Sequence, residues 1–149
     1  MTIRRWYYLF DRHYRWNILA RSLEYCRKNK ELKLYSFVFM LNHIHLIISS
    51  PDVSGFVRDF KKFTSKELKR NIEMNEKNIL PLFLNESGQY EFWERTNMPK
   101  IIETGSFFLQ KLEYIHQNPV RKQYVVEAKD WYWSSANPSC ELTVDGMES

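Results

Sequence analysis

Two histidines separated by a single residue, His43 and His45, are the first candidates for chemistry in this chain. In a β-strand, residues i and i+2 point to the same side, so both imidazoles can reach one point while Ile44 faces the other way. Neutral imidazoles are good ligands for divalent cations. The same spacing also occurs on ordinary strand surfaces, so the pair alone is a weak signal for a metal site.

A second candidate, Tyr114, lies in the segment Tyr114-Ile115-His116-Gln117-Asn118-Pro119. Helical neighbours three and four residues apart share a face, which puts Tyr114 beside Gln117 and Asn118 and turns His116 away. A phenol and an amide oxygen on that face could address the same ion. Pro119 disfavours helical geometry at Asn118, which is therefore either a ligand or a C-terminal cap, with Gln117 as the competing ligand.

The charge balance admits nucleic acid as a partner. The chain has 22 Lys and Arg against 18 Asp and Glu, a net charge of +4 and a pI near 9.0. Basic residues also serve solubility on exposed helix faces, so the charge alone does not single out DNA. The candidates for phosphate contact are Arg4, Arg5, Arg58, Lys61, Lys62, Lys66, Lys69, Arg70, Arg121 and Lys122.

In the first half of the chain, segments that favour strands alternate with a segment whose apolar residues have helical spacing. The aromatic-rich stretch Trp6–Phe10 favours a strand, and apolar residues at helical spacing from Ile18 predict a helix that ends in a basic run at Lys30. Leu32–Met40 and His43–Ser50 follow as two antiparallel strands of a hairpin, joined through a tight connection.

The second half begins with a helix-start signal at 51–54, and the helical period then continues through about Arg70. The periodicity fails over 71–89, which predicts a long connection, and 90–93 could form a last strand. Ser106 is expected to cap a final helix that Pro119 stops. Strand, helix, strand, strand, helix, strand and helix together make an α+β pattern.

The length of 149 residues suits one domain, expected over residues 1–136, with a loose tail over 137–149. The two cysteines, Cys26 and Cys140, lack the spacing of a disulfide pair or a metal site. The sequence contains neither a secretory leader pattern nor an apolar run of membrane-spanning length, so a cytoplasmic protein is the expectation.

Four segments in this order resemble one known family. They are Phe39-Met40-Leu41-Asn42-His43-Ile44-His45-Leu46-Ile47-Ile48, Phe92-Trp93, Leu112-Glu113-Tyr114-Ile115-His116-Gln117-Asn118-Pro119-Val120-Arg121, and Asp130-Trp131-Tyr132-Trp133-Ser134-Ser135. From about Arg4 to Ser135 the chain is similar to the single-tyrosine HUH transposases, specifically the insertion-sequence-200-like group and its REP-associated relatives.

The resemblance implies a ferredoxin-like antiparallel sheet with helices packed on it, metal binding by His43 and His45, and Tyr114 as the nucleophile. Asn118 occupies the position of the third ligand, which is a glutamine in the insertion-sequence group and Asn in the REP-associated relatives. The implied partner is single-stranded or hairpin DNA, and the relatives include dimers, so a homodimer is a further expectation.

The expected reaction is attack by Tyr114 on a phosphodiester of single-stranded DNA, with a 5′-phosphotyrosine intermediate and a free 3′-hydroxyl. An open site that shares a substrate phosphate suits Mg²⁺ or Mn²⁺, although two histidines would also accept Zn²⁺ or Ni²⁺. Two alternatives remain open at this point. One is a catalytically silent nucleic-acid-binding module on the same scaffold, and the other is a metallohydrolase whose histidine pair activates water.

Overall fold

The computed structural model describes residues 1–96 and 99–146, and the chain forms two compact units that alternate along the sequence. The first unit comprises Met1–Leu32, Leu41–His43 and Ser50–Asn97, and the second comprises Lys33–Met40, Ile44–Ser49 and Met98–Ser149. The expected boundary between a domain at 1–136 and a tail at 137–149 stays a prediction, and residues 97–98 and 147–149 lie outside the described residues.

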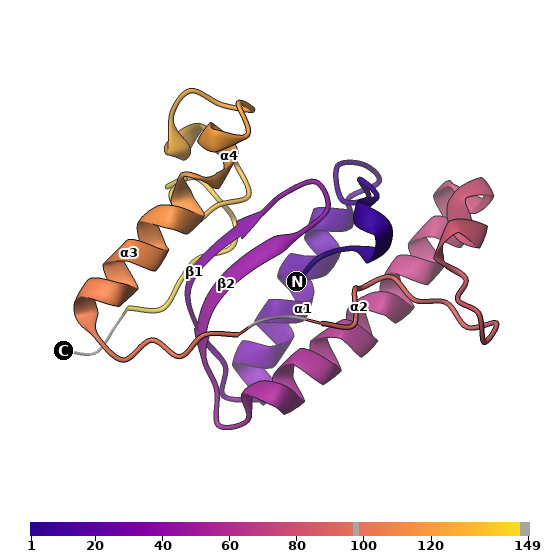
Figure 1. Cartoon of the computed structure of the whole chain (residues 1–149), viewed down its shortest axis with the longest axis horizontal. Coiled ribbons are helices and arrows are strands. Elements are labelled where there is room, and N and C mark those ends of the chain that lie inside the picture. Colours follow the sequence, from indigo (N-terminus) through magenta and orange to yellow (C-terminus); the bar gives the residue numbers. More distant parts are fainter. Residues whose placement is uncertain (97–98, 147–149) are drawn as a thin grey trace. The chain divides into compact units, whose positions relative to one another are not determined.

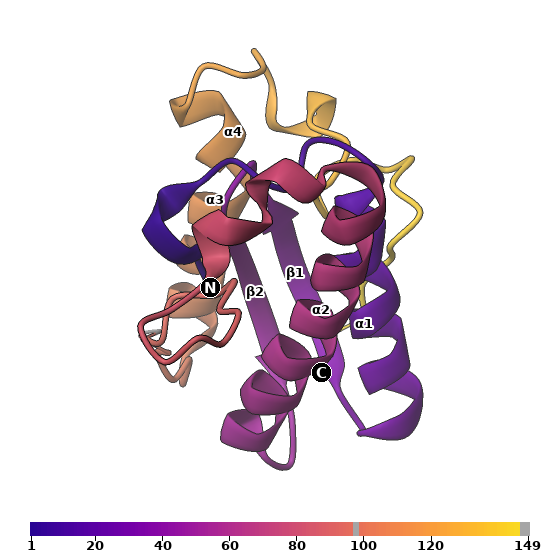
Figure 2. The ribbon, with the colours of Figure 1, turned by 90° about the vertical axis from the view of Figure 1, so that its right-hand side faces the viewer.

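Two long helices, α1 (Arg15–Asn29) and α2 (Val53–Asn75), lie side by side in the first unit (Figures 1 and 2). Apolar residues at helical spacing are buried on both helices, among them Leu19, Leu23, Phe60 and Leu68. Both helices were predicted, but α2 was expected to end near Arg70. It continues for another turn because Ile72 extends the apolar stripe and is fully buried.

The predicted first strand over Trp6–Phe10 is wrong. Arg4–Trp6 forms a short 3₁₀ helix, η1, in which Arg5 and Trp6 have left-handed backbone angles, with φ of 56° and 63°. Extended pairing is limited here to isolated bridges of Thr2 with His43 and of Ile3 with Trp93. The aromatic content that suggested a strand comes partly from exposed side chains, because Trp6 is 67% exposed.

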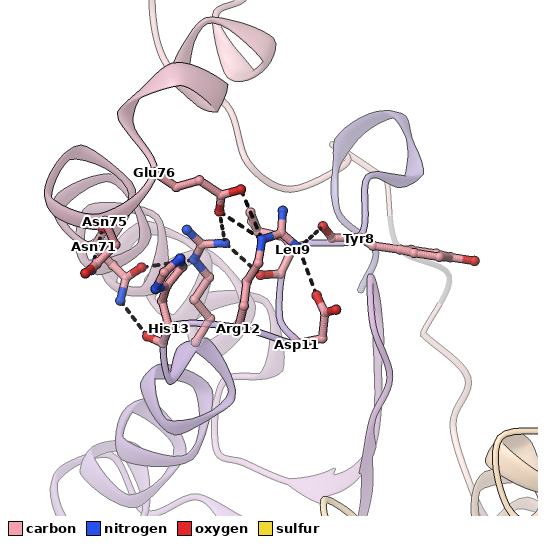
Figure 3. Close-up of polar contacts among 9 residues, drawn as sticks. Tyr8, Leu9, Asp11, Arg12, His13, Asn71, Asn75 and Glu76 are labelled. Carbon is pink, nitrogen blue, oxygen red and sulfur yellow. Dashed lines mark hydrogen bonds and ion pairs between the residues drawn. The ribbon is translucent and has the colours of Figure 1, made fainter.

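A buried arginine ties the beginning of α1 to the end of α2. Arg15 is fully buried, with Nη1 lying 2.9 Å from Glu76 Oε1 and Nε donating to Asn71 Oδ1 at 3.0 Å. Arg12 donates from Nε to both carboxylate oxygens of Glu76 (Figure 3). Although burial acts to raise the pKa of Glu76, the hydrogen bonds from Arg12 and Arg15 hold it below its ordinary value.

Between residues 71 and 96 the structure differs from the prediction in two places. The expected connection over 71–89 contains the end of α2 and a 3₁₀ helix, η2 (Lys77–Phe83). The predicted strand over 90–93 is wrong, because Tyr90 and Trp93 make only isolated bridges. Trp93 is anchored by its side chain instead, since Nε1 donates to Thr64 Oγ1 at 2.9 Å.

The second unit is built on an antiparallel hairpin of β1 (Lys33–Phe39) and β2 (Ile44–Ser49), as predicted. The register pairs Phe39 with Ile44 and Val38 with His45. Helix α3 (Gly105–His116) packs on this hairpin. One hydrophobic cluster of the unit is formed by Val38, Met40, Ile47 and Ile115.

The start and end of α3 differ from the prediction. Thr104, and not Ser106, is the N-cap, and its side chain accepts the Phe107 N–H at 3.1 Å because α3 begins at Gly105. Helix α3 does end before Pro119, but Pro119 is itself helical in α4 (Asn118–Arg121), where it occupies the first turn. Proline suits that position since its missing N–H would have no intrahelical partner there.

The segment after a short 3₁₀ helix, η3 (Ala128–Asp130), pairs with β1 at several points. Val38 bridges Ser134, and the Phe39 N–H donates to Trp133 O at 2.8 Å. Further along, the backbone N–H of Asp145 donates to Leu34 O at 2.7 Å. Backbone pairing therefore holds this segment beside β1 at Trp133, Ser134 and Asp145.

The α+β class is confirmed as a mixture of helices with an antiparallel sheet. In the described part of the chain that sheet has two regular strands, so the larger ferredoxin-like sheet stays a prediction. Both cysteines are buried free thiols, and burial raises the pKa of each. Across residues 1–96 and 99–146, no helix has the length and apolar character that crossing a membrane requires.

Candidate active site around Tyr114

Tyr114 lies on α3 in the second unit and meets one of the two candidate histidines. Its neighbour Ile115 is buried against the hairpin, while Tyr114 itself remains 50% exposed. The ring of His45, from β2, approaches the Tyr114 ring edge to face, with centroids 6.0 Å apart and planes at 85°. The structure thus brings together two residues that lie 69 positions apart in the sequence.

Two cations surround the Tyr114 ring. Arg121 lies over it, with Cζ 4.2 Å from the ring centroid, and its Nη2 donates to the Tyr114 carbonyl oxygen at 2.7 Å. The Nζ atom of Lys111 is 5.5 Å from the same centroid. Arg121 was expected to contact phosphate, but its packing on Tyr114 was missed, as was Lys111. Lys111 precedes Tyr114 by three residues on the helix, and this spacing could have identified it as a neighbour of the ring.

The two candidate amides differ in burial. Asn118 begins α4 and is only 5% exposed, whereas Gln117 is partly exposed and forms the C-cap of α3. Among the described residues, no hydrogen bond involves the side-chain amide of Asn118; its backbone oxygen accepts the Lys122 N–H. Asn118 is therefore the more buried of the two candidate amides.

His116 links the helix that bears Tyr114 to Ser36 on β1 and to Ser135. Its Nε2 lies 2.7 Å from Ser135 Oγ and 3.4 Å from Ser36 Oγ, and Ser135 Oγ in turn donates to Phe37 O at 3.2 Å. Burial lowers the pKa of His116, which Glu113 opposes in part. This connection joins α3 to β1 and to the C-terminal segment, and thereby sets the position of the Tyr114 backbone.

His43 belongs to the first unit and immediately precedes β2. Its Nδ1 lies 2.8 Å from Oδ1 of Asn42, whose Nδ2 donates to Trp6 O at 3.0 Å. Because the amide nitrogen is the donor to Trp6, Oδ1 accepts from His43, so the proton is on Nδ1 and the lone pair on Nε2. Asn42 is 8% exposed and was not recognised from the sequence as the residue that orients His43.

The expected metal site depends on the donor atoms that its ligands provide. Within the described part of the chain, no group of three or more His, Cys, Asp and Glu side chains could hold a metal ion. The expected set differs from such a group because it combines two imidazoles with the amide oxygen of Asn118. Imidazole nitrogens and amide oxygens are both donor types that divalent cations accept.

Many of the expected phosphate contacts have partners within the protein. Arg4 lies 3.4 Å from Glu91, and Lys61 donates to Glu94 O at 3.0 Å, where burial lowers the pKa of the lysine while Glu94 partly opposes the shift. Ion pairs also involve the side chains of Arg58, Lys69 and Arg70, with Asp59, Glu73 and Glu67. For Arg5, Lys62, Lys66 and Lys122, no side-chain ion pair is seen within the described residues, and all four are exposed. The role of these residues in DNA binding stays a prediction.

Two comparisons with known proteins agree with each other. Residues 2–118 match the family described as "Transposase IS200 like". A solved structure described as the "REP associates tyrosine transposase bound to a REP hairpin" superposes with a TM-score of 0.69 at 17% identity, covering 99% of this chain and 89% of that chain. At this identity, the superposition shows a similar fold. No protein of curated function matches the chain.

Proposed function

The chain belongs to the IS200-like transposase family, and we propose that it cuts and rejoins single-stranded DNA through a covalent bond to Tyr114. Family membership supports transposase activity, that is, DNA cleavage and transfer. The observation that carries the choice of nucleophile is the half-exposed Tyr114 ring on α3, which has His45 at its edge and Arg121 over its face.

In the proposed reaction, the Tyr114 oxygen attacks a backbone phosphorus. A bond forms between that oxygen and phosphorus, the bond from phosphorus to the 3′ oxygen breaks, and the phenol proton is lost to solvent while the leaving oxygen gains one. The products are a 5′-phosphotyrosine and a free 3′-hydroxyl, which can attack the phosphotyrosine of another junction. One phosphoester replaces another, so no nucleotide cofactor is consumed.

The residues around Tyr114 have separate tasks in this proposal. Arg121 holds the phenol in one orientation and puts a positive charge beside the phosphate that the phenol attacks. Lys111 adds a second charge close to the ring. His116 holds α3 against β1 without touching the reacting atoms.

Mg²⁺ or Mn²⁺ is the proposed cofactor, with His43, His45 and Asn118 as its protein ligands. Bound to a non-bridging phosphate oxygen, such an ion would make the phosphorus more electrophilic and offset the charge that develops during attack. The hydrogen bond from His43 Nδ1 to Asn42 would leave Nε2 as the coordinating atom, and the buried amide of Asn118 would supply an oxygen. Histidine and amide donors are compatible with either ion.

Single-stranded DNA folded into a hairpin is the proposed partner, since the similar solved structure is described as bound to a REP hairpin. The ferredoxin-like sheet is also part of the proposal. The bridges of Thr2 with His43 and of Ile3 with Trp93 support it, because they are antiparallel pairings outside the two regular strands. A homodimer stays an expectation from the family resemblance.

The test is a covalent-adduct assay. Purified protein is incubated with a pool of end-labelled single-stranded hairpins and Mn²⁺, and the products are resolved on a denaturing protein gel. We expect a labelled adduct that requires the metal and is lost in Tyr114→Phe but retained in Tyr8→Phe, which alters another exposed tyrosine.

The alternative outcomes are distinct. Binding of the hairpins without cleavage by the wild-type protein would favour a silent binding module. Metal-dependent cleavage without an adduct would favour a metallohydrolase. An adduct that persists in Tyr114→Phe would show that the nucleophile is another residue.

A further inference from the structure

A groove of about 450 Å³ lies between α1 and α2 in the first unit. From α1 and its C-cap it is lined by Ser22, Tyr25, Cys26 and Lys30, and from α2 by Asp59, Phe60, Lys62, Phe63 and Lys66. Lys62 and Lys66 are among the expected phosphate contacts, and none of the lining residues takes part in the reaction proposed at Tyr114. We propose that this groove binds single-stranded DNA, with a base stacked on Tyr25 and Phe63 and backbone phosphates contacting Lys62 and Lys66.

The aromatic pair is the first observation in favour. The rings of Tyr25 and Phe63 are nearly parallel, with an interplanar angle of 6° and centroids 5.9 Å apart. Both remain exposed, Tyr25 to 51% and Phe63 to 44%. Proteins that bind single strands use such aromatic faces because every base offers a flat surface for stacking, whatever the sequence.

The charges on the groove are the second observation. Lys62 and Lys66 are four residues apart on α2 and therefore share a face, an arrangement that slightly destabilises a helix. In the described part of the chain, neither lysine is seen in an ion pair. Asp59 is the acidic residue in the lining, and it is already paired with Lys30 at 2.8 Å. The groove thus carries an excess of positive charge that complements a phosphate backbone.

A nucleic acid fits these observations better than an apolar protein segment. A protein partner seated by Tyr25 and Phe63 would leave Lys62 and Lys66 beside apolar surface without acidic partners. A single strand supplies flat bases and phosphates at adjoining positions, and so matches both features. The inference deepens the proposed function, on which it rests for the choice of DNA as the nucleic acid.

Binding is best measured by fluorescence anisotropy with the full chain carrying Tyr114→Phe, so that cleavage does not alter the probe. The probe is a fluorescein-labelled single-stranded oligothymidylate of roughly 12 nucleotides, within the site sizes of single-strand binders. Replacing Tyr25 and Phe63 together with Ala should weaken binding by about tenfold, the lower part of the range for loss of one stacked base. The control alters Tyr8 to Ala, an exposed tyrosine outside the groove, and should bind as before.

The lysines have their own readout, which is the dependence of affinity on salt. Replacing Lys62 and Lys66 with Ser should reduce the slope of log affinity against log salt by about 1.4, or roughly 0.7 for each lost phosphate contact. The matched control, Lys77→Ser with Lys100→Ser, removes the same charge from exposed positions outside the groove and should leave more of the slope intact.

Unchanged probe affinity in the aromatic variant would overturn the inference, provided its circular dichroism and melting temperature match those of the parent. A change in self-association without a change in probe binding would also overturn it and would assign the groove to a second copy of the chain. The adduct assay with Tyr114 restored separates the two proposals. Failure of the wild-type protein to form the adduct would count against the proposed function, whereas the groove is tested by probe affinity, which needs no cleavage.

Discussion

The guanidinium of Arg121 stacks on the ring of Tyr114 at 4.2 Å and also donates a 2.7 Å hydrogen bond to the carbonyl oxygen of that tyrosine. One side chain therefore fixes both the backbone end and the aromatic face of the proposed nucleophile. Arg121 is positioned to do so by α4, the short helix that begins after α3 ends.

Replacement of Arg121 with Ala should slow formation of the tyrosine–DNA adduct by about tenfold, which corresponds to roughly 1.4 kcal/mol in the barrier. The loss has two sources, the mobility of the freed phenol and the missing positive charge. Arg121→Lys keeps the charge without the planar stack and should fall between the two rates. Single-turnover adduct kinetics measure this, and equal rates for all three proteins would exclude a role for Arg121 in catalysis.

Replacement of Asn118 with Ala should weaken Mn²⁺ binding by at least about tenfold, because the buried amide is the proposed third ligand. Asn118→Gln retains an amide oxygen and should recover part of the affinity, while Gln117→Ala should bind as the parent does. Isothermal titration with Mn²⁺ alone reports this without any DNA. A larger effect in Gln117→Ala than in Asn118→Ala would transfer the ligand role to Gln117.

Replacement of Glu76 with Gln should lower the free energy of unfolding at neutral pH by about 2 kcal/mol, because Arg12 and the buried Arg15 lose their carboxylate partner. The folded-state pKa of Glu76 lies below its ordinary value of 4.5, so its contribution is complete above that value and is lost as pH falls through it toward the folded pKa. The difference between wild type and variant should therefore shrink as the pH falls below 4.5.

Urea unfolding across this pH range measures the difference. Glu73→Gln is the control, because Glu73 is an exposed carboxylate in the last turn of α2, and its pair with Lys69 spans 3.7 Å. A constant difference between wild type and Glu76→Gln at every pH would show that the carboxylate charge is not what stabilises the arginines.

Two glycines in the first turns of helices should respond differently to replacement with Ala. A Cβ at Gly55 would overlap the carboxylate of Asp52, which caps α2 by accepting the Gly55 N–H, whereas a Cβ at Gly105 meets open space. Both substitutions gain helix propensity, but Gly55→Ala also loses the cap. Gly105→Ala should therefore be the more stable variant by about 1 kcal/mol. Equal thermal stability of the two would indicate that the Asp52 cap contributes little.

Sequence periodicity was enough to place the two long helices, the hairpin and the helix that bears Tyr114. In the two long helices the repeated apolar spacing was matched by burial, as at Leu19, Leu23, Phe60 and Leu68. Such patterns survive in the sequence because burial of one face is the main source of stability for these elements. The two short strands expected near the N-terminus and at 90–93 had only aromatic content to support them, and both were wrong.

The candidate site was likewise predicted only in part from the sequence. Strand spacing pointed to His43 and His45, and the ordered motifs pointed to Tyr114 and Asn118. The approach of His45 to Tyr114 then required α3 to pack on the hairpin, which places a β2 side chain against a helix far along the chain. Three contacts depend on side-chain orientation and distance, which the spacing of residues in the sequence does not specify. They are those of Arg121 with the Tyr114 ring, of Asn42 with His43 and of Ser135 with His116.

The sequence by itself determined the two long helices, the hairpin and the helix that bears Tyr114, as well as which residue types are available for metal and phosphate chemistry, because these follow from local periodicity and side-chain composition. The tertiary structure alone decided where α3 is capped, which amide near Tyr114 is buried and which cation covers its ring. A cap, a buried amide and a stacked guanidinium each depend on the partner that packing brings within a few ångströms, and packing is settled by the whole fold.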